Sequence, residues 1–145
     1  MVKVLIKKLN PAVEIPEYKS SGASGMDLNA FVEKPVTIKS KTSTLIPTGL
    51  SVAFSEDYEI QIRPRSGLAV KNNITILNTP GTIDSDYRGE IKVLIFNHGN
   101  VDFIINNGDR IAQMILSPVV KIDLELINDL PETIRGEGGF GSTGK

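Results

Sequence analysis

The sequence contains no cysteine and no tryptophan, and it has a single histidine, His98. Without cysteine, the chain has no thiol nucleophile, no zinc–thiolate site and no disulfide. One histidine is too few for a multi-histidine metal site within one chain. Any catalysis by this chain therefore depends on carboxylates, hydroxyls, amides and basic side chains.

Long apolar runs and an excess of one charge are also lacking. No stretch reaches the roughly 20 apolar residues of a membrane-spanning helix. Lysines interrupt the opening MVKVLIKKLNP before any cleavage site of a signal peptide. The sequence has 16 basic and 17 acidic side chains, which gives a net charge of −1. Proteins that bind long nucleic acids or anionic membranes need an excess of basic side chains. We therefore expect a cytoplasmic protein with neither nucleic acid nor membrane as a partner.

What the 145 residues do contain is a series of short segments rich in Val, Ile, Leu and Phe, separated by clusters of Gly, Pro, Asn, Asp and Ser. This pattern predicts one all-β domain, a sandwich or barrel of many short strands. One short helix is expected, at Ser66–Asn72. The strands are expected at Val2–Leu9, Met26–Phe31, Thr44–Ile46, Leu50–Phe54, Glu59–Arg63, Ile74–Leu77, Glu90–Asn97, Val101–Ile105, Arg110–Leu116 and Val119–Leu126.

The last segment, residues 135–145, differs from residues 1–134 in composition. It reads RGEGGFGSTGK, so it loses much backbone entropy on ordering and has little to bury. One interpretation is a frayed terminus. The other is a mobile C-terminal lid of the same domain that orders on a ligand. The lid is suggested by a cation, a ring and two hydroxyls, which are Arg135, Phe140, Ser142 and Thr143.

The segment RPRSGL carries groups suited to an anionic ligand. Pro64 disfavours helical geometry in the residue before it and so ends the preceding strand. Arg65, Ser66 and Gly67 then place a guanidinium, a hydroxyl and backbone amides at the start of the short helix, which is an anion-binding arrangement. The alternative is an ordinary solvated turn.

The segment NTPGTIDSDYRG is interpreted as a β-hairpin rimmed by Asn78, Asp84, Asp86 and Tyr87. A carboxylate on such a rim can orient and deprotonate a water, and an exposed tyrosine can pack on a sugar or a base. The alternative is that the Asp and Ser side chains only stabilise turns.

Two further polar residues stand among apolar neighbours. Asp27 lies at the start of a strand, either as a turn-capping residue or as a carboxylate that faces a metal. Gln113 alternates with Ile111 and Ile115, so we expect it on their face. There its amide needs a partner, which is another subunit, a buried backbone group or a ligand.

Taken together and in this order, five segments resemble the trimeric deoxyuridine triphosphatase (dUTPase) family over nearly the whole chain. They are ASGMDLNA at Ala23–Ala30, RPRSGLA at Arg63–Ala69, NTPGTIDSDYRGEI at Asn78–Ile91, GDRIAQMIL at Gly108–Leu116 and RGEGGFGSTG at Arg135–Gly144. The resemblance implies a jelly-roll-like fold and a homotrimer with active sites shared between subunits. It also implies Mg²⁺-dependent hydrolysis of dUTP to dUMP and pyrophosphate, which limits uracil incorporation into DNA and supplies dUMP for thymidylate synthesis.

The resemblance also implies roles for the hairpin residues. Asp84 would activate the water that attacks the α-phosphorus. Main-chain groups around Lys92, helped by the Asn78 amide, would accept the uracil. Tyr87 would underlie the deoxyribose and reject a ribose 2′-hydroxyl.

Other subunits would complete the site. By the same resemblance, phosphates would be held by Arg65, Ser66, Gly67 and Gln113 of a neighbouring subunit. Asp27 would support Mg²⁺ through its water shell, with Arg110 in the same polar network. The tail of a further subunit would close over the nucleotide, with Phe140 stacked on uracil and with Arg135, Ser142 and Thr143 on the phosphates.

Two other functions are compatible with this kind of fold. A dCTP deaminase of the same fold is similar in architecture, but by family resemblance it uses a Glu in the base pocket and has no tyrosine at the position of Tyr87. A jelly-roll structural or nucleotide-sensing protein would lack the catalytic carboxylate or the tail. Here Asp84, Tyr87 and the tail motif are all present, so the sequence favours a dUTP diphosphatase.

Overall fold

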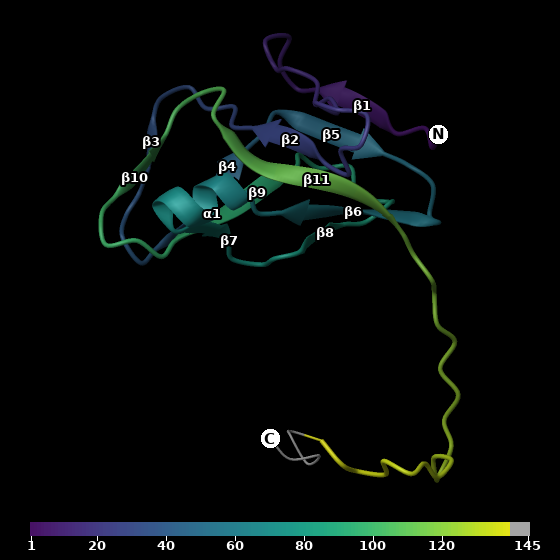
Figure 1. Cartoon of the computed structure of the whole chain (residues 1–145). Helices are drawn as coiled ribbons and strands as arrows, with labels where there is room; N and C mark the ends of the chain where they lie inside the picture. The colour runs from purple at the N-terminus through teal and green to yellow at the C-terminus, as the bar shows by residue number, and fades with distance from the viewer. Residues whose placement is uncertain (140–145) are drawn as a thin grey trace.

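Eleven short strands and one helix make up the part of the computed structural model that is described here, residues 1–139 (Figure 1). In chain order the elements are β1 (Leu5–Lys8), β2 (Met26–Asn29), β3 (Val36–Ile38), β4 (Ser43–Pro47), β5 (Leu50–Ala53), β6 (Tyr58–Arg63), α1 (Ser66–Asn72), β7 (Ile74–Ile76), β8 (Gly81–Ile83), β9 (Lys92–Asn97), β10 (Phe103–Ile105) and β11 (Arg110–Pro118). Helix α1 has the predicted bounds. In these residues, no helix is long and apolar enough to span a bilayer.

The strands form four small antiparallel sheets. The largest has the order β2-β11-β6-β8, the next has the order β4-β9-β7, and two pairs are β1-β5 and β10-β3. Most neighbours within a sheet are far apart in the sequence, as in jelly rolls, where strands cross between two facing sheets. The predicted all-β, jelly-roll-like fold with one short helix is confirmed.

Alternating side chains of the sheets fill the core. In β6, Ile60 and Ile62 are 2% and 3% exposed, while Gln61 between them is half-buried. β6 is therefore a half-buried strand. In β9, Val93 and Ile95 are buried, while Leu94 and Phe96 on the outer face are only partly covered.

The predicted strand at Val119–Leu126 is wrong. β11 ends at Pro118, and the chain then leaves the β domain as an extended arm (Figure 1). The alternation of apolar and charged residues is typical of a strand, yet Ile122 and Leu124 are 78% and 84% exposed. A strand needs a neighbour for its backbone N–H and C=O groups, and no described part of the chain pairs with this segment.

Candidate functional site

A pocket of about 470 Å³ opens at the predicted hairpin. Its walls are formed by Leu45, Thr82, Ile83, Asp84, Tyr87, Glu90 and Lys92. The predicted β-hairpin is wrong, because its two arms do not pair with each other: β8 pairs with β6, whereas β9 pairs with β4 and β7. The last hydrogen bond between β9 and the segment after β7 runs from the Leu77 N–H to the Leu94 carbonyl. Beyond it, backbone groups at Lys92 face the pocket without a strand partner on that edge, so they are available to a flat polar ligand.

A tight turn presents Asp84 and Tyr87 at this pocket. The Tyr87 N–H donates to the Asp84 carbonyl (3.1 Å), which closes the turn. The Arg88 guanidinium donates to the carbonyls of Ser85 (2.7 Å) and Tyr87 (3.0 Å). The Asp84 carboxylate is exposed at the rim, where it can accept a proton from a bound water.

A second cluster lies around Asp27 and joins three of the sequence motifs. The two carboxylate oxygens of Asp27 accept hydrogen bonds from Arg65 Nε (2.8 Å) and from Arg110 Nη1 (3.4 Å). The Asp27 and Arg65 side chains are only 21% and 24% exposed, so this ion pair is screened less than one at the surface. In this chain the Asp27 carboxylate orients two arginines.

Gln113 belongs to the same cluster, because it lies opposite Asp27 in the β11–β2 pair. Its Nε2 donates to the Pro64 carbonyl (2.9 Å), so within the chain its partner is a backbone group. Gln113 shares a face with Ile115, as predicted, because a Cβ placed on Gly25 would meet both side chains. Ile111 is buried in the core next to a register shift between Arg110 and Ala112.

These two clusters lie at opposite ends of β6. Asp84 follows Ile83, which pairs with Ile60 near the start of β6, whereas Arg65 follows the end of β6 at Arg63. Gln113, opposite Asp27, pairs with Arg63, so about four residues of β6, roughly 13 Å, separate these levels. Three strand spacings, roughly 14 Å, also separate β8 from β2 across the sheet. The chain thus brings together Asp84, Tyr87 and Lys92, and separately Asp27, Arg65, Arg110 and Gln113. It does not bring the two groups together.

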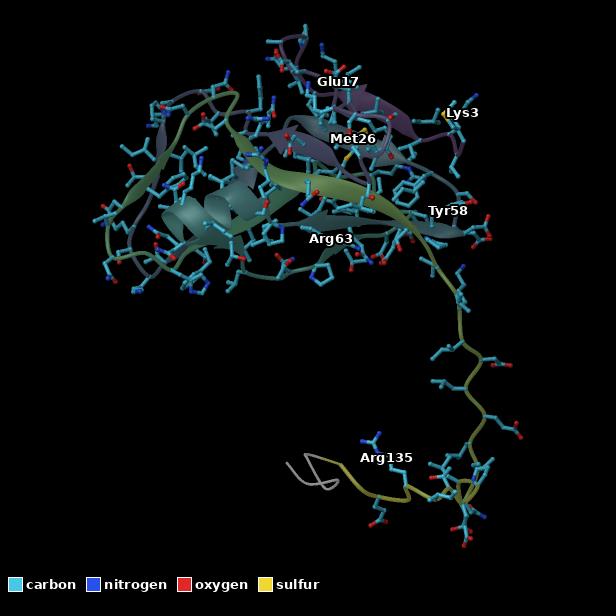
Figure 2. All side chains as sticks on the ribbon, in the orientation of Figure 1. Lys3, Glu17, Met26, Tyr58, Arg63 and Arg135 are labelled. Carbon is cyan, nitrogen blue, oxygen red and sulfur yellow. The ribbon has the colours of Figure 1, made fainter. Side chains whose placement is uncertain are left out.

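The remaining predicted site residues lie elsewhere. Ser66 and Gly67 begin helix α1 directly after Arg65, as predicted. The Asn78 amide lies beside Gly81, at the other end of β8 from Asp84. Arg135 lies on the arm, apart from both clusters (Figure 2), where its Nε donates to the Gly138 carbonyl (2.7 Å). Phe140, Ser142 and Thr143 lie outside the described residues.

The root of the arm passes close to the Asp84 turn. An open pocket is lined by Asp84 and Asp86 together with Glu56 and Lys121. Lys121 donates to Glu56 (2.7 Å), and this hydrogen bond raises the pKa of the Lys121 ammonium, with smaller contributions from nearby carboxylates. No sequence motif marked this contact, because the two residues are 65 positions apart.

Sequence reasoning also missed Glu90 and Leu45 as pocket residues. Leu45 had no detectable signal, because it reaches the pocket from a different strand. Glu90 is a charged residue at the start of a predicted strand, but the sequence pattern does not indicate that it lines the pocket.

A jelly-roll-like domain with an exposed carboxylate over a pocket and a separate arginine cluster defines an all-β enzyme that acts on an anionic small molecule. The dUTPase family model matches residues 12–144, and the chain belongs to this family. A deoxyuridine 5'-triphosphate nucleotidohydrolase of Rickettsia conorii is 55% identical over 145 residues, covering 99% of this chain and 98% of the relative. The predicted family and enzyme class are confirmed.

Solved structures with the same fold are more distant in sequence. The dUTPase of Staphylococcus bacteriophage 80alpha, a mutant solved with dUpNHpp, has a TM-score of 0.87 at 23% identity and covers 99% of both chains. A mutant dUTPase of phage phi11 of S. aureus, reported with a structural Mg(II) ion, has a TM-score of 0.80 at 20% identity. It covers 90% of this chain and 99% of its own. These similarities support the jelly-roll fold.

Proposed function

We propose that this chain hydrolyses dUTP to dUMP and pyrophosphate with Mg²⁺, in the cytoplasm. The reaction limits uracil incorporation into DNA and supplies dUMP for thymidylate synthesis. The observation that carries the proposal is the pocket between β8 and β9, in which Asp84, Tyr87 and Lys92 meet in a member of the dUTPase family.

The loop that joins β8 to β9 selects the nucleoside. The backbone groups at Lys92 that lack a strand partner offer a donor and an acceptor to the polar edge of uracil, and the Asn78 amide adds to them. The Tyr87 ring packs beneath the deoxyribose and leaves no room for a 2′-hydroxyl. The separation of β8 from β9 into two sheets supports this role, because the base then replaces a missing strand neighbour.

Asp84 activates the attacking water. The carboxylate accepts a proton as the water oxygen bonds to the α-phosphorus, and the bond from that phosphorus to the bridging oxygen breaks to release pyrophosphate. Arg65, Ser66, Gly67 and Gln113 hold the phosphates, where a guanidinium and backbone amides stabilise the developing negative charge.

Mg²⁺ is the proposed cofactor. Within residues 1–139, no three His, Cys, Asp or Glu side chains are grouped to hold a metal directly. A site with few protein ligands suits Mg²⁺, because this ion keeps several waters and binds through substrate phosphates and few carboxylates. Asp27, oriented by Arg65 and Arg110, would hold the ion indirectly through water. When bound, the ion neutralises charge on the phosphates.

A homotrimer with shared sites is supported by two observations. First, in one chain Asp84 and the cluster around Asp27 and Arg65 are roughly 13 Å apart along β6 and roughly 14 Å apart across the sheet, too far for both to contact the same pair of phosphates. The phosphate-binding cluster therefore comes from a second subunit. Second, the arm has the alternation of a strand but no strand partner among residues 1–139, and an edge of a neighbouring sheet would supply one.

The C-terminal segment, residues 135–145, acts in this proposal as a lid of the same domain, contributed by a further subunit. Phe140 stacks on the uracil, and Arg135, Ser142 and Thr143 contact phosphates. A lid that closes over the nucleotide excludes water from the reacting groups.

Deletion of residues 135–145 is expected to lower turnover by at least about tenfold while leaving thermal unfolding without ligand nearly unchanged. The reason is that none of residues 135–139 is buried against the β domain. Calorimetry and a pyrophosphate assay measure the two effects, and deletion of Lys145 alone is the control. A truncated enzyme that works at the full-length rate would show that the segment is only a chain end.

The substrate and the metal are tested by incubating the protein with dUTP, dCTP, dTTP and UTP, with Mg²⁺ or with EDTA. Release of pyrophosphate from dUTP alone, and its loss in EDTA, are the expected results. Deamination of dCTP would instead favour the deaminase, and no turnover of any nucleotide would favour a binding protein.

A further inference from the structure

The Tyr87 ring is folded back onto the chain that follows it. Its hydroxyl donates to the Glu90 carbonyl (3.1 Å). A Cβ placed on Gly89 would lie 2.5 Å from the Tyr87 Cζ and still closer to the hydroxyl oxygen. Gly89 does not have the positive φ that favours glycine. The glycine is therefore needed for the space that the tyrosine ring occupies and not for its backbone conformation.

The Glu90 carbonyl that anchors this hydroxyl is itself held firmly. The Glu90 carboxylate accepts a hydrogen bond from the Gly49 N–H (2.8 Å). The next residue, Ile91, donates its N–H to the Leu50 carbonyl (2.8 Å), and its carbonyl accepts from the Thr48 hydroxyl (2.6 Å). Three hydrogen bonds thus connect the segment after Tyr87 to the turn between β4 and β5.

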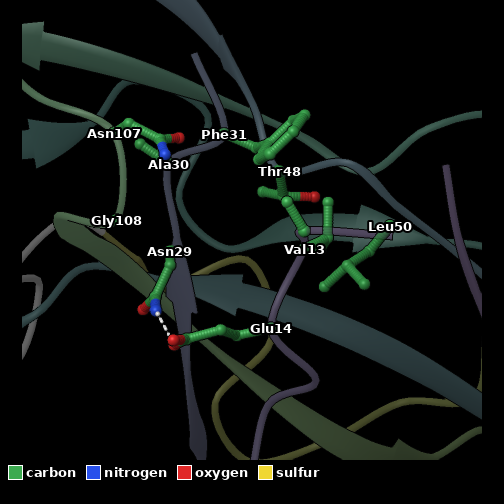
Figure 3. Close-up of a pocket in the computed structure, with 10 residues that line it drawn as sticks. Val13, Glu14, Asn29, Ala30, Phe31, Thr48, Leu50, Asn107 and Gly108 are labelled. Carbon is green, nitrogen blue, oxygen red and sulfur yellow. Dashed lines mark hydrogen bonds between the residues drawn. The ribbon is translucent and has the colours of Figure 1, made fainter. Parts of the chain in front are cut away.

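That turn is a rigid support. Gly49 has a φ of +69°, and a Cβ there would overlap Val13 and touch the Phe31 ring. Val13, Phe31, Thr48 and Leu50 surround a cavity of only about 90 Å³ beneath the turn (Figure 3). Packing from the core therefore fixes the Gly49 N–H to which Glu90 binds.

We propose that Gly89 and Glu90 are specificity-determining positioning residues, which hold the Tyr87 ring in place and so set how strictly the site excludes a ribose 2′-hydroxyl. The inference rests on the proposed role of Tyr87. Neither residue needs to touch the nucleotide. Gly89 leaves space for the ring against the backbone, and Glu90 fixes the carbonyl whose hydrogen bond stops the ring from swinging outward. The Tyr87 ring excludes the 2′-hydroxyl by contact, so this exclusion is lost when the ring moves away by about the width of a methyl group.

The Gly89→Ala variant tests the first half of the proposal. Tyr87 is 44% exposed, so its ring can move outward to admit the methyl group and the chain should still fold. The measurement is the ratio of the Kd of UpNHpp to that of dUpNHpp by titration calorimetry. We expect the ratio to fall by about tenfold or more, with thermal unfolding little changed. Gly22→Ala is the matched control, because a Cβ at Gly22 meets no atom within 4 Å.

Two variants of Glu90 test the second half. Glu90→Gln keeps an oxygen that accepts from the Gly49 N–H, so it should retain the wild-type ratio. Glu90→Ala loses that bond and should lower the ratio. A purely structural role would lower the stability of Glu90→Ala and weaken both analogues equally, and that result would overturn the role of Glu90.

Tyr87→Ala separates this inference from the function on which it rests. If Tyr87→Ala lowers the ratio but Gly89→Ala does not, the positioning role of Gly89 is wrong and the role of Tyr87 stands. If the ratio in Tyr87→Ala equals that of the wild type, the sugar-excluding role of Tyr87 is itself wrong, and the positioning proposal is overturned with it.

Discussion

Asp84→Asn enzyme is expected to bind dUpNHpp with nearly wild-type affinity and to lose turnover of dUTP by a factor of roughly 10² or more. An amide is close in size to the carboxylate and can still orient a water, but it does not take up the proton. The turn that carries Asp84 is closed by backbone groups and by Arg88, so its shape does not depend on the carboxylate. Single-turnover kinetics with dUTP and titration with dUpNHpp measure the two effects.

The matched control is Asp102→Asn. The Asp102 carboxylate accepts from the Ser40 N–H (3.0 Å), and the residue lines neither pocket at the Asp84 turn. An asparagine keeps an acceptor there, so turnover should stay near the wild-type rate. The role of Asp84 would be wrong if Asp84→Asn turned over dUTP as fast as this control, or if it lost binding and turnover to the same degree.

Local patterns predicted much of the fold. The bounds of α1 follow from Pro64 before it and from the polar residues at its end, which are signals carried by a few neighbouring residues. Alternation placed β6 and its buried face for the same reason. The alternation at Val119–Leu126 predicted a strand that the structure lacks, because alternation does not indicate whether a second strand is available to pair with the segment. Pairing is a property of the assembled chain.

The site was predictable in its residue types but not in its arrangement. Motif spacing singled out Asp27 and Arg65, yet their ion pair joins positions 38 apart, and no local pattern encodes such a contact. The register shift in β11 beside the buried Ile111 likewise belongs to the pairing with β2. The support of Tyr87 by Glu90 and the Gly49 turn arises where three strands meet, so only the folded chain reveals it.

Mixing two inactive proteins is expected to restore activity, because the proposed site takes Asp84 from one subunit and Arg65 from the next. Arg65→Ala removes a phosphate ligand, and Asp84→Asn removes the base, so each homotrimer lacks an essential group at every site. In randomly mixed trimers, a site is intact where an Arg65→Ala chain supplies Asp84 and an Asp84→Asn chain supplies Arg65. This combination occurs at about a quarter of the sites when equal amounts are mixed in a closed ring.

Co-expression of the two variants with different affinity tags, followed by purification through both tags, yields the mixed trimers. Because purification through both tags removes the homotrimers, each remaining trimer has one intact site, so turnover per chain should approach about a third of the wild-type value. Sedimentation should give the mass of three chains. Arg65→Ala mixed with Arg65→Ala/Asp84→Asn is the control, since no pairing of these chains regenerates a complete site. If mixing the two single variants gave no more activity than each alone, Asp84 and Arg65 would have to act within one chain. The separation of the two clusters along β6 would then have to close by a rearrangement of the β domain.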